Sequence, residues 1–385
     1  MSLPDTPSTL PVEVDQVTAE WASKALGHPV KELTLKQAMH GTASKLLYKV
    51  TYEDEDSTDN SARPSDICVK GGFNPQLVAL HPALTAVYRR EADFYARMAP
   101  ELAALGMRLP KSWYNGVVPD RSDGQGIVVV DDLTASGNTF GDPLEPWPVD
   151  RVRKGVEQLA IMHAATWGAD PAEYAWLIRD HEASASEPDD KGTDLREVIL
   201  GLMSPPAWEV RFGPGHPPVP PHMMDRERMV RAFKTLWFDK TKAGRDALMR
   251  CVVHGDSHIG NTYVTPDGEP AFLDWQAPHV HSALHDVAYF IIGSLTVDDR
   301  RANEVSLFEH YLDTLHAKGG PRFGMEEVWD DYRRHVFHGF AWSLTPPMMQ
   351  PQDKVDAMTV RHCAAIVDHG TLELLEASEG YVTEV

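Results

Sequence analysis

The sequence predicts an α+β protein with a smaller, β-rich N-terminal lobe and a larger, mainly helical C-terminal lobe. Apolar runs typical of strands are concentrated in the first third of the chain, whereas helical periodicity dominates after residue 150. A stretch rich in turn formers, TASGNTFGDPLEPWP, separates the two parts. The 385 residues suffice for one to three domains. We therefore expect two lobes, at residues 1–132 and 133–385.

The first lobe contains segments with the composition of strands and one long amphipathic helix. Strands are expected within 31–52 (two, joined near His40), at 67–69 and at 127–133. Residues 83–105 carry apolar side chains at helical spacings and end before Gly106, a plausible helix stop. A short helix near the N-terminus is expected to be capped by Asp15.

The second lobe shows helical periodicity over most of its length. Helices are expected at 150–168, 225–249, 283–295, 302–318, 325–343 and 353–377. The exception is residues 204–222, where seven prolines favour a loop or an extended arm.

The chain is strongly acidic. Its 36 Lys and Arg residues against 57 Asp and Glu residues give a formal net charge of −21. Such a surface repels nucleic acids and anionic lipids at long range. We therefore expect no nucleic-acid or membrane partner, and the charge is compatible with a cationic small molecule.

The cysteines and the N-terminus indicate a protein of a reducing compartment. Cys68, Cys251 and Cys363 are far apart and form no CxxC pair, so neither a disulfide framework nor a zinc ribbon is expected. The N-terminal residues lack the basic start and apolar core of a signal peptide. The longest apolar run, near 287–295, is too short to span a bilayer. These features predict a cytoplasmic location.

The segment from Cys251 to Phe290 carries the clearest chemical pattern. Residues 261–265 alternate like a strand, PDGE is a tight-turn sequence, and residues 270–274 can return as the partner strand. With Asp267-Gly268 at the centre of the turn, Asn261 would face Asp274 with Cβ atoms about 5 Å apart. An amide oxygen and a carboxylate at that separation suit Mg²⁺. Asp256, in the loop entering the hairpin, could accept a proton from an attacking hydroxyl.

Phosphoryl transfer also needs a cation for the nucleotide phosphates. Lys70, at the end of the buried strand 67–69, is the candidate. A lone buried ammonium is costly, so Lys70 needs a carboxylate partner, and Glu91 in the helix 21 residues later can supply it.

These motifs together resemble the aminoglycoside phosphotransferase and choline kinase superfamily, and most closely its ecdysteroid kinase-like members. HGDSHIGN followed by LDWQ is similar to the HGDxxxxN…DW pattern of that superfamily. VVVDDL, LAIMHAATWG, HDVAYF and EADFY resemble its adenine hinge, the helix after the linker, the loop-supporting segment and the segment with the lysine's partner. The resemblance implies a bilobal, protein-kinase-like fold.

By position, the resemblance implies roles for individual residues. Asp256 is the catalytic base, and Asn261 and Asp274 are the metal ligands. Lys70 contacts the α- and β-phosphates of ATP and is paired with Glu91, while the backbone at Asp131–Leu133 binds adenine.

Three further positions belong to this expectation. Asp286 is expected to accept hydrogen bonds from catalytic-loop N–H groups, although a charge at a helix N-terminus would also explain it. His254 is expected to be a structural hydrogen-bonding group. The usual glycine-rich phosphate loop would lie near 40–45, but only Gly41 is present, so Ser44 and its small neighbours would have to bring backbone N–H groups to the phosphates.

The expected activity is transfer of the γ-phosphoryl group of ATP to a hydroxyl of a small molecule, with ATP and Mg²⁺ as cofactors. The acceptor stays open among aminoglycosides, choline-like amines, sugars, steroids and macrolides. Two alternatives remain. One is a binding scaffold or pseudokinase on the same fold. The other is a metal-dependent hydrolase in which His254, Asp256 and His258 hold Zn²⁺.

Overall fold

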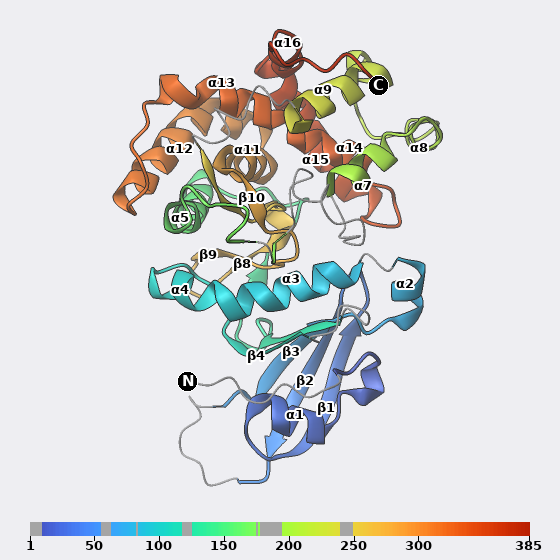
Figure 1. Cartoon of the computed structure of the whole chain (residues 1–385), viewed down its shortest axis with the longest axis vertical. Coiled ribbons are helices and arrows are strands. Elements are labelled where there is room, and N and C mark those ends of the chain that lie inside the picture. The colour runs from blue at the N-terminus through green and yellow to red at the C-terminus, as the bar shows by residue number, and fades with distance from the viewer. Residues whose placement is uncertain are drawn as a thin grey trace. The chain divides into compact units, whose positions relative to one another are not determined.

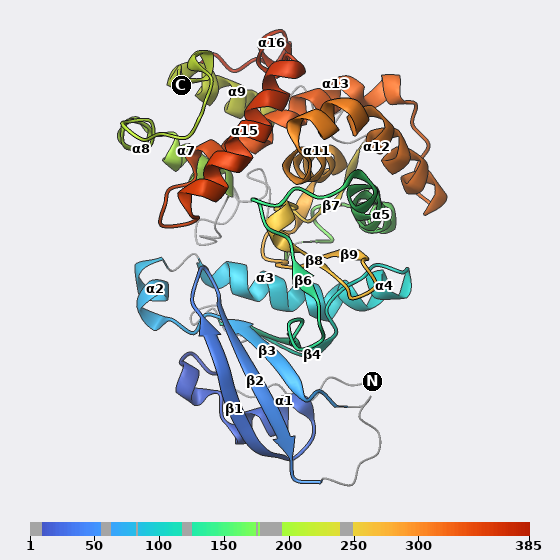
Figure 2. The ribbon, with the colours of Figure 1, turned by 180° about the vertical axis from the view of Figure 1, so that it is seen from behind.

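The computed structural model describes residues 10–54, 63–81, 84–117, 125–174, 176–177, 195–238 and 249–385 (Figures 1 and 2). The chain divides into two compact units, each described by itself. The first comprises residues 1–139, 187–193 and 273–277, and the second comprises residues 140–186, 194–272 and 278–385. The predicted α+β class is confirmed, because the first unit is built around an antiparallel sheet and the second is mainly helical.

Within the residues described, the first unit contains a five-stranded sheet in the order β1-β2-β3-β5-β4, with every neighbouring pair antiparallel. Its elements are η1 (Val14–Gln16), α1 (Ala19–Leu26), β1 (Val30–Met39), β2 (Ser44–Tyr52), β3 (Asp66–Gly71), α2 (Pro75–Leu80), α3 (Leu84–Arg97), α4 (Ala99–Ala104), β4 (Ser112–Val117) and β5 (Gly126–Asp131). The short β6 (Thr139–Phe140) straddles the division between the units.

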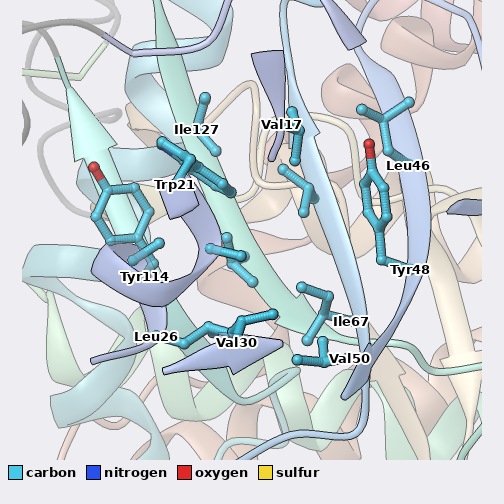
Figure 3. Packing of buried hydrophobic residues seen from close by; sticks show 14 of the residues in the cluster. Val17, Trp21, Leu26, Val30, Leu46, Tyr48, Val50, Ile67, Tyr114 and Ile127 are labelled. Atoms are coloured by element: carbon cyan, nitrogen blue, oxygen red, sulfur yellow. The ribbon is translucent and has the colours of Figure 1, made fainter. Parts of the chain in front are cut away.

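The two faces of this sheet have different partners. Alternate residues of the strands, such as Leu46 and Val69, form a hydrophobic core with Trp21 and other side chains of α1 (Figure 3). Trp21 meets Tyr114 of β4 edge to face, with ring centroids 5.7 Å apart. Because side chains alternate along a strand, Lys70 points to the opposite face from Val69. The long helix α3 packs against β4 and β5.

Two details of the first unit differ from the sequence expectation. The first α-helix is capped by Thr18, whose hydroxyl accepts from Trp21 N at 3.2 Å, and not by Asp15, which lies in η1. The helix expected over 83–105 is two helices, α3 and α4, because Pro100 has no N–H and occupies the first turn of α4. Residue 83 lies outside the described residues.

The second unit consists of helices and two small sheets. One sheet is the antiparallel pair β7–β10, and the other has the strand order β6-β8-β9, with β8 and β9 antiparallel. Its elements are α5 (Val149–Ala165), α7 (Leu195–Leu202), α8 (Pro205–Arg211), η2 (Pro221–Met223), α9 (Arg226–Phe238), β7 (Arg250–Val253), η4 (Ile259–Asn261), β8 (Thr262–Val264), β9 (Pro270–Phe272), β10 (His279–Ser282), α11 (Ala283–Ser294), α12 (Val297–Ala317), α13 (Met325–His335), η5 (Val336–Phe340), α14 (Ala341–Leu344), α15 (Gln352–Asp368) and α16 (Thr371–Glu376).

Helix α11 is the centre of this unit, since all twelve of its residues are buried. It contacts α5, α12, α13, α15 and β7. Ser282 caps its N-terminus, and β10 ends at that same residue. The start of α11 is therefore held against β7, the strand that leads into residues 254–258.

The hairpin register expected for residues 261–274 is wrong by one residue. Thr262 pairs with Phe272 and Val264 with Pro270, so Asn261 is not paired with Asp274. The cause is the turn: Thr265 N donates to Glu269 O at 2.9 Å, which leaves a three-residue loop with Gly268 at φ 82°. Such a loop adds one residue on one side of the hairpin.

The proline-rich segment 204–222 was expected to be a loop or an arm, but it contains α8 and η2. Both begin with proline, which is accepted in the first turn of a helix because the N–H it lacks has no partner there. The helix expected over 325–343 is interrupted by the 3₁₀ segment η5. For the helix expected over 225–249, α9 is the described part, and residues 239–248 lie outside it.

No helix within the described ranges combines the length and apolar character that crossing a membrane requires.

Candidate active site

The loop that follows β7 is anchored by a buried carboxylate. Asp286, in the first turn of α11, accepts from His254 N at 2.6 Å and from Gly255 N at 3.0 Å. His163 of α5 lies 3.2 Å from the same carboxylate. Burial alone would raise the pKa of Asp286, but His163 and the His254 backbone lower it below its usual value. The expected hydrogen bonds from Asp286 to the loop are therefore present.

Asp256 lies at the apex of this loop, and its side chain is 45% exposed. Asn261 Nδ2 donates to both the backbone oxygen and Oδ2 of Asp256, each at 2.9 Å. His254 is fully buried and accepts from Asp256 N through Nδ1 at 3.2 Å, which agrees with the structural role expected for it. The result is an oriented, accessible carboxylate.

In the first unit, Lys70 forms a buried ionic cluster. Its Nζ lies 2.8 Å from Glu91 Oε1 and 2.8 Å from Asp274 Oδ1. The pairing expected between Lys70 and Glu91 is therefore present. Burial alone would lower the pKa of Lys70, but Asp274 and Glu91 raise it above its usual value.

The segment carrying Asp274 is docked on α3 of the same unit. Trp275 is fully buried and stacks on Phe94, with centroids 4.1 Å apart. Gln276 Nε2 donates to Glu91 at 3.2 Å, and Arg90 donates to the Gln276 backbone oxygen at 2.6 Å. Asp274 has a left-handed backbone, with φ 67°, which is uncommon for a residue other than glycine.

Sequence reasoning missed several partners of these groups. Lys45 Nζ lies 3.5 Å from Asp274 Oδ2, and His163 contacts Asp286. Gln276 donates to Glu91, and Arg90 donates to the backbone oxygen of Gln276. Two weak signals were present: Gln276 directly follows the aspartate-tryptophan pair, and Lys45 lies next to Ser44.

Asn261 and Asp274, the expected metal ligands, belong to different units, so the geometry of each is known within its own unit. Asn261 directs its amide nitrogen at Asp256, which turns its amide oxygen away from that carboxylate. Asp274 offers two carboxylate oxygens. Amide and carboxylate oxygens fit the donor preference of Mg²⁺.

The residues expected to contact the nucleotide also lie in the first unit. Gly41 is exposed in the β1–β2 connection, and the buried Ser44 shares a hydrogen bond with His40 Nδ1 at 2.9 Å. At the end of β5, Asp131 Oδ1 accepts from Trp113 at 2.7 Å. Leu133 O accepts from Asn138 N at 3.0 Å, within the turn that follows.

The zinc set of the hydrolase alternative is not a ligand cluster. His258 Nε2 lies 3.6 Å from Asp256 Oδ2, but His254 Nδ1 is occupied by the loop backbone. In the part of the chain that the structure describes, one group of three His, Cys, Asp or Glu side chains could hold a metal. It consists of His281, His285 and His335 and includes neither His254 nor Asp256.

Comparison with known proteins identifies a family. Residues 42–183 and 226–319 match the family described as ecdysteroid kinase-like. The matched residues cover more than half of the chain and include Asp256, Asn261 and Asp274. No curated protein matches the sequence significantly.

Solved structures of small-molecule kinases resemble most of the chain at low sequence identity. A choline kinase, LicA, from Streptococcus pneumoniae is 15% identical, with a TM-score of 0.47, over 91% of this chain and 98% of its own. An AMP-bound spectinomycin phosphotransferase is 12% identical, with a TM-score of 0.47, over 96% of this chain and 100% of its own. A microcompartment-associated aminopropanol kinase is 11% identical, with a TM-score of 0.46, over 95% of this chain and 99% of its own.

Proposed function

Because the chain belongs to the ecdysteroid kinase-like family, we propose that it transfers the γ-phosphoryl group of ATP to a hydroxyl of a small molecule. The observation that carries this proposal is the catalytic loop. Its backbone is held by Asp286, and its exposed carboxylate, Asp256, is oriented by Asn261. A general base needs this combination of access and orientation.

In this mechanism Asp256 accepts the proton of the acceptor hydroxyl as its oxygen attacks the γ-phosphorus in line. The bond from that phosphorus to the β–γ bridging oxygen breaks, and ADP leaves. The base is held from two sides, since Asn261 binds its side chain and His254 binds its N–H. Holding the carboxylate in place removes the entropic cost of positioning it during the reaction.

We assign Asn261 and Asp274 as the residues that hold Mg²⁺. When bound there, Mg²⁺ neutralises the charge that develops on the transferred phosphoryl group. Lys70 contacts the α- and β-phosphates in this proposal, and Glu91 keeps it in place. Gly41 and Ser44 contribute to the phosphate loop, and the backbone of Asp131–Leu133 binds adenine.

The lobes divide the work in this proposal. Residues 1–132 bind the nucleotide, and residues 133–385 supply the base and the acceptor site. The net charge of −21 supports a neutral or cationic acceptor over an anionic one. The widely spaced cysteines support a protein that acts in the cytoplasm.

Screening a library of hydroxyl compounds for ADP release tests the activity and identifies the acceptor. With that acceptor, Asp256→Asn should lower kcat by at least about 10²-fold, because the base is lost. Asp274→Ala should abolish transfer, because a proposed metal ligand is lost. Asp267→Asn is the matched control, since Asp267 is exposed at the hairpin turn, and it should keep wild-type activity.

Two results would count against the proposal. Wild-type turnover in Asp274→Ala would remove the metal assignment. A melting temperature that does not rise with millimolar Mg·ATP would favour the binding scaffold over the kinase.

A further inference from the structure

A cluster of histidines lies in the second unit, behind the catalytic loop. Its members come from β10, α11, α13 and η5, and each has a ring centroid within 6.5 Å of another's: His279, His281, His285, His335 and His338. Trp237 of α9 packs against four of these rings. Every imidazole carries two ring nitrogens that need partners when they are buried, so five such rings packed together require a chemical explanation.

Three members have the arrangement of metal ligands. One ring nitrogen from each of His281, His285 and His335 lies within 4.8 Å of the nitrogens of the other two. Zn–N bonds of about 2.0–2.1 Å in a tetrahedral site place ligand nitrogens about 3.4 Å apart. Small rotations of the rings about their side-chain bonds cover the difference.

The three side chains are anchored in packed structure. His285 and His335 are buried, and His281 is partly buried at the end of β10. His285 Nε2 lies 3.5 Å from Gly255 O, whereas its Nδ1 is buried and has no hydrogen-bond partner within the described ranges. A buried polar atom without a partner is unfavourable, and a bound cation would satisfy it.

We propose that His281, His285 and His335 together bind one divalent transition-metal cation, with Zn²⁺ as the natural occupant. Imidazole nitrogens suit Zn²⁺, Cu²⁺ and Ni²⁺, whereas Mg²⁺ and Ca²⁺ prefer oxygen ligands. Three protein ligands are a common set for zinc, with the fourth position taken by water or a further side chain.

The electrostatic surroundings agree with this assignment. His285 is buried among neighbouring imidazoles, and imidazole binds a metal through an unprotonated ring nitrogen.

The site has a structural consequence for the catalytic loop. His285 precedes Asp286, whose carboxylate holds His254 N and Gly255 N. An ion that ties β10, α11 and α13 together at His285 would hold the start of α11, and with it the anchor of that loop. The ion would act by keeping this anchor in place.

The test uses the full-length, tag-free protein, stripped with a chelator, dialysed, and given Zn²⁺. After desalting, elemental analysis should find about one zinc per chain, and Zn²⁺ but not Mg²⁺ should raise the melting temperature. The Co²⁺-loaded protein should show the visible absorption bands of a four-coordinate site. His281→Gln and His335→Gln should each weaken Zn²⁺ binding by more than about tenfold. Substituting a residue that only hydrogen-bonds to a metal ligand already costs about 10- to 100-fold in affinity, and loss of a ligand itself should cost at least as much.

His310→Gln is the matched control, because His310 lies on α12 and contacts Glu157. It should bind zinc as the wild type does. Absence of zinc from the reloaded wild type, or its retention in both ligand variants, would overturn the proposal. If His335→Gln fails to fold, the zinc content of His281→Gln, a substitution at a partly buried position, tests the proposal.

The outcome is separable from that of the proposed kinase activity. Asp256→Asn should bind zinc normally while losing transfer, so each proposal can fail alone. Finding zinc in the purified protein is therefore not by itself an argument for a hydrolase. Only the histidine variants show which residues bind the zinc.

Discussion

At the scale of single residues, Lys70 shows how burial changes the effect of an ion pair on folding stability. Its side chain is 9% exposed, and it faces Glu91, which is 5% exposed. Surface ion pairs contribute little to stability, but removing one partner of a buried pair leaves a charge without compensation. The role proposed for Lys70 in binding nucleotide therefore depends on an ion pair that also holds α3 to the sheet.

Lys70→Met should lower the free energy of unfolding by about 3–5 kcal/mol, because the buried Glu91 loses its cationic partner. Lys49→Met is the matched control on the neighbouring strand, where Lys49 is half exposed and pairs with Asp66 at 2.9 Å. It should cost at most about 1 kcal/mol. Urea unfolding measures both.

The double variant Lys70→Met/Glu91→Leu refines this prediction. It should be more stable than the sum of the two single losses implies, because one buried charge is removed along with its partner. Strict additivity of the two losses would show that Lys70 and Glu91 are not coupled.

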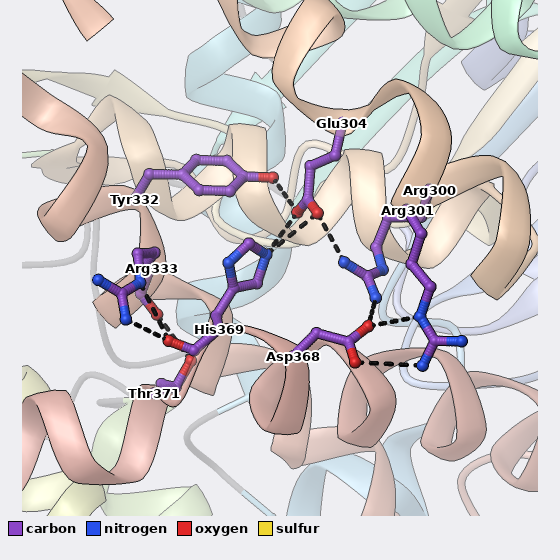
Figure 4. A network of polar contacts seen from close by, with 8 residues as sticks. All are labelled: Arg300, Arg301, Glu304, Tyr332, Arg333, Asp368, His369 and Thr371. Carbon is purple, nitrogen blue, oxygen red and sulfur yellow. Dashed lines mark hydrogen bonds and ion pairs between the residues drawn. The ribbon is translucent and has the colours of Figure 1, made fainter. Parts of the chain in front are cut away.

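At the scale of elements, a polar network joins three helices of the second unit (Figure 4). Glu304 of α12 accepts from Arg300 at 2.6 Å and from Tyr332 of α13 at 2.8 Å. His369, which follows α15, lies 3.0 Å from the same carboxylate. Asp368 binds both Arg300 and Arg301, so the end of α15 is tied to the start of α12. This network determines how the helix ends meet.

Glu304 should make stability depend on pH. Burial alone would raise its pKa, but His369 and Arg300 lower it below the ordinary value of 4.5. A lowered folded-state pKa contributes stability above pH 4.5, and this contribution is lost as the pH falls through the folded-state value. Glu304→Gln should therefore be less stable than wild type at pH 7, by about 1–3 kcal/mol, and the difference should shrink below pH 4.5.

Chemical denaturation at several pH values measures this difference. Glu309→Gln is the control, because Glu309 is exposed on the same helix and should cost little at any pH. A gap between wild type and Glu304→Gln that stays constant from pH 7 to acid would contradict the assignment.

The elements also show where local patterns predict structure. The strands at 67–69 and 127–133 and the helices at 150–168 and 283–295 are present near their predicted bounds, because a buried run or a helical apolar face is a local property. The predictions that were wrong concern positions where a small local difference changes the structure. A three-residue turn shifted the hairpin register, and prolines that suggested a loop begin α8.

At the scale of the whole molecule, net charge is the dominant property. A charge of −21 keeps molecules apart at neutral pH, and the sequence pI is about 5.2. Solubility should therefore pass through a minimum near pH 5.2 and rise steeply towards pH 7. Turbidity of the protein across a pH series measures this, and a minimum well away from the pI would indicate that an apolar surface, not charge, controls association.

The sequence by itself determined the class of the fold, the ecdysteroid kinase-like resemblance and the candidate residues, because these depend on periodicity and on short motifs. Asp256, Asn261, Lys70 and Asp286 were all identifiable in this way. Only the tertiary structure decided which groups meet. The contact of Lys70 with Asp274 joins residues 204 positions apart, and the three histidines come together from β10, α11 and α13. Such contacts depend on how elements pack, and no local pattern encodes packing between distant segments.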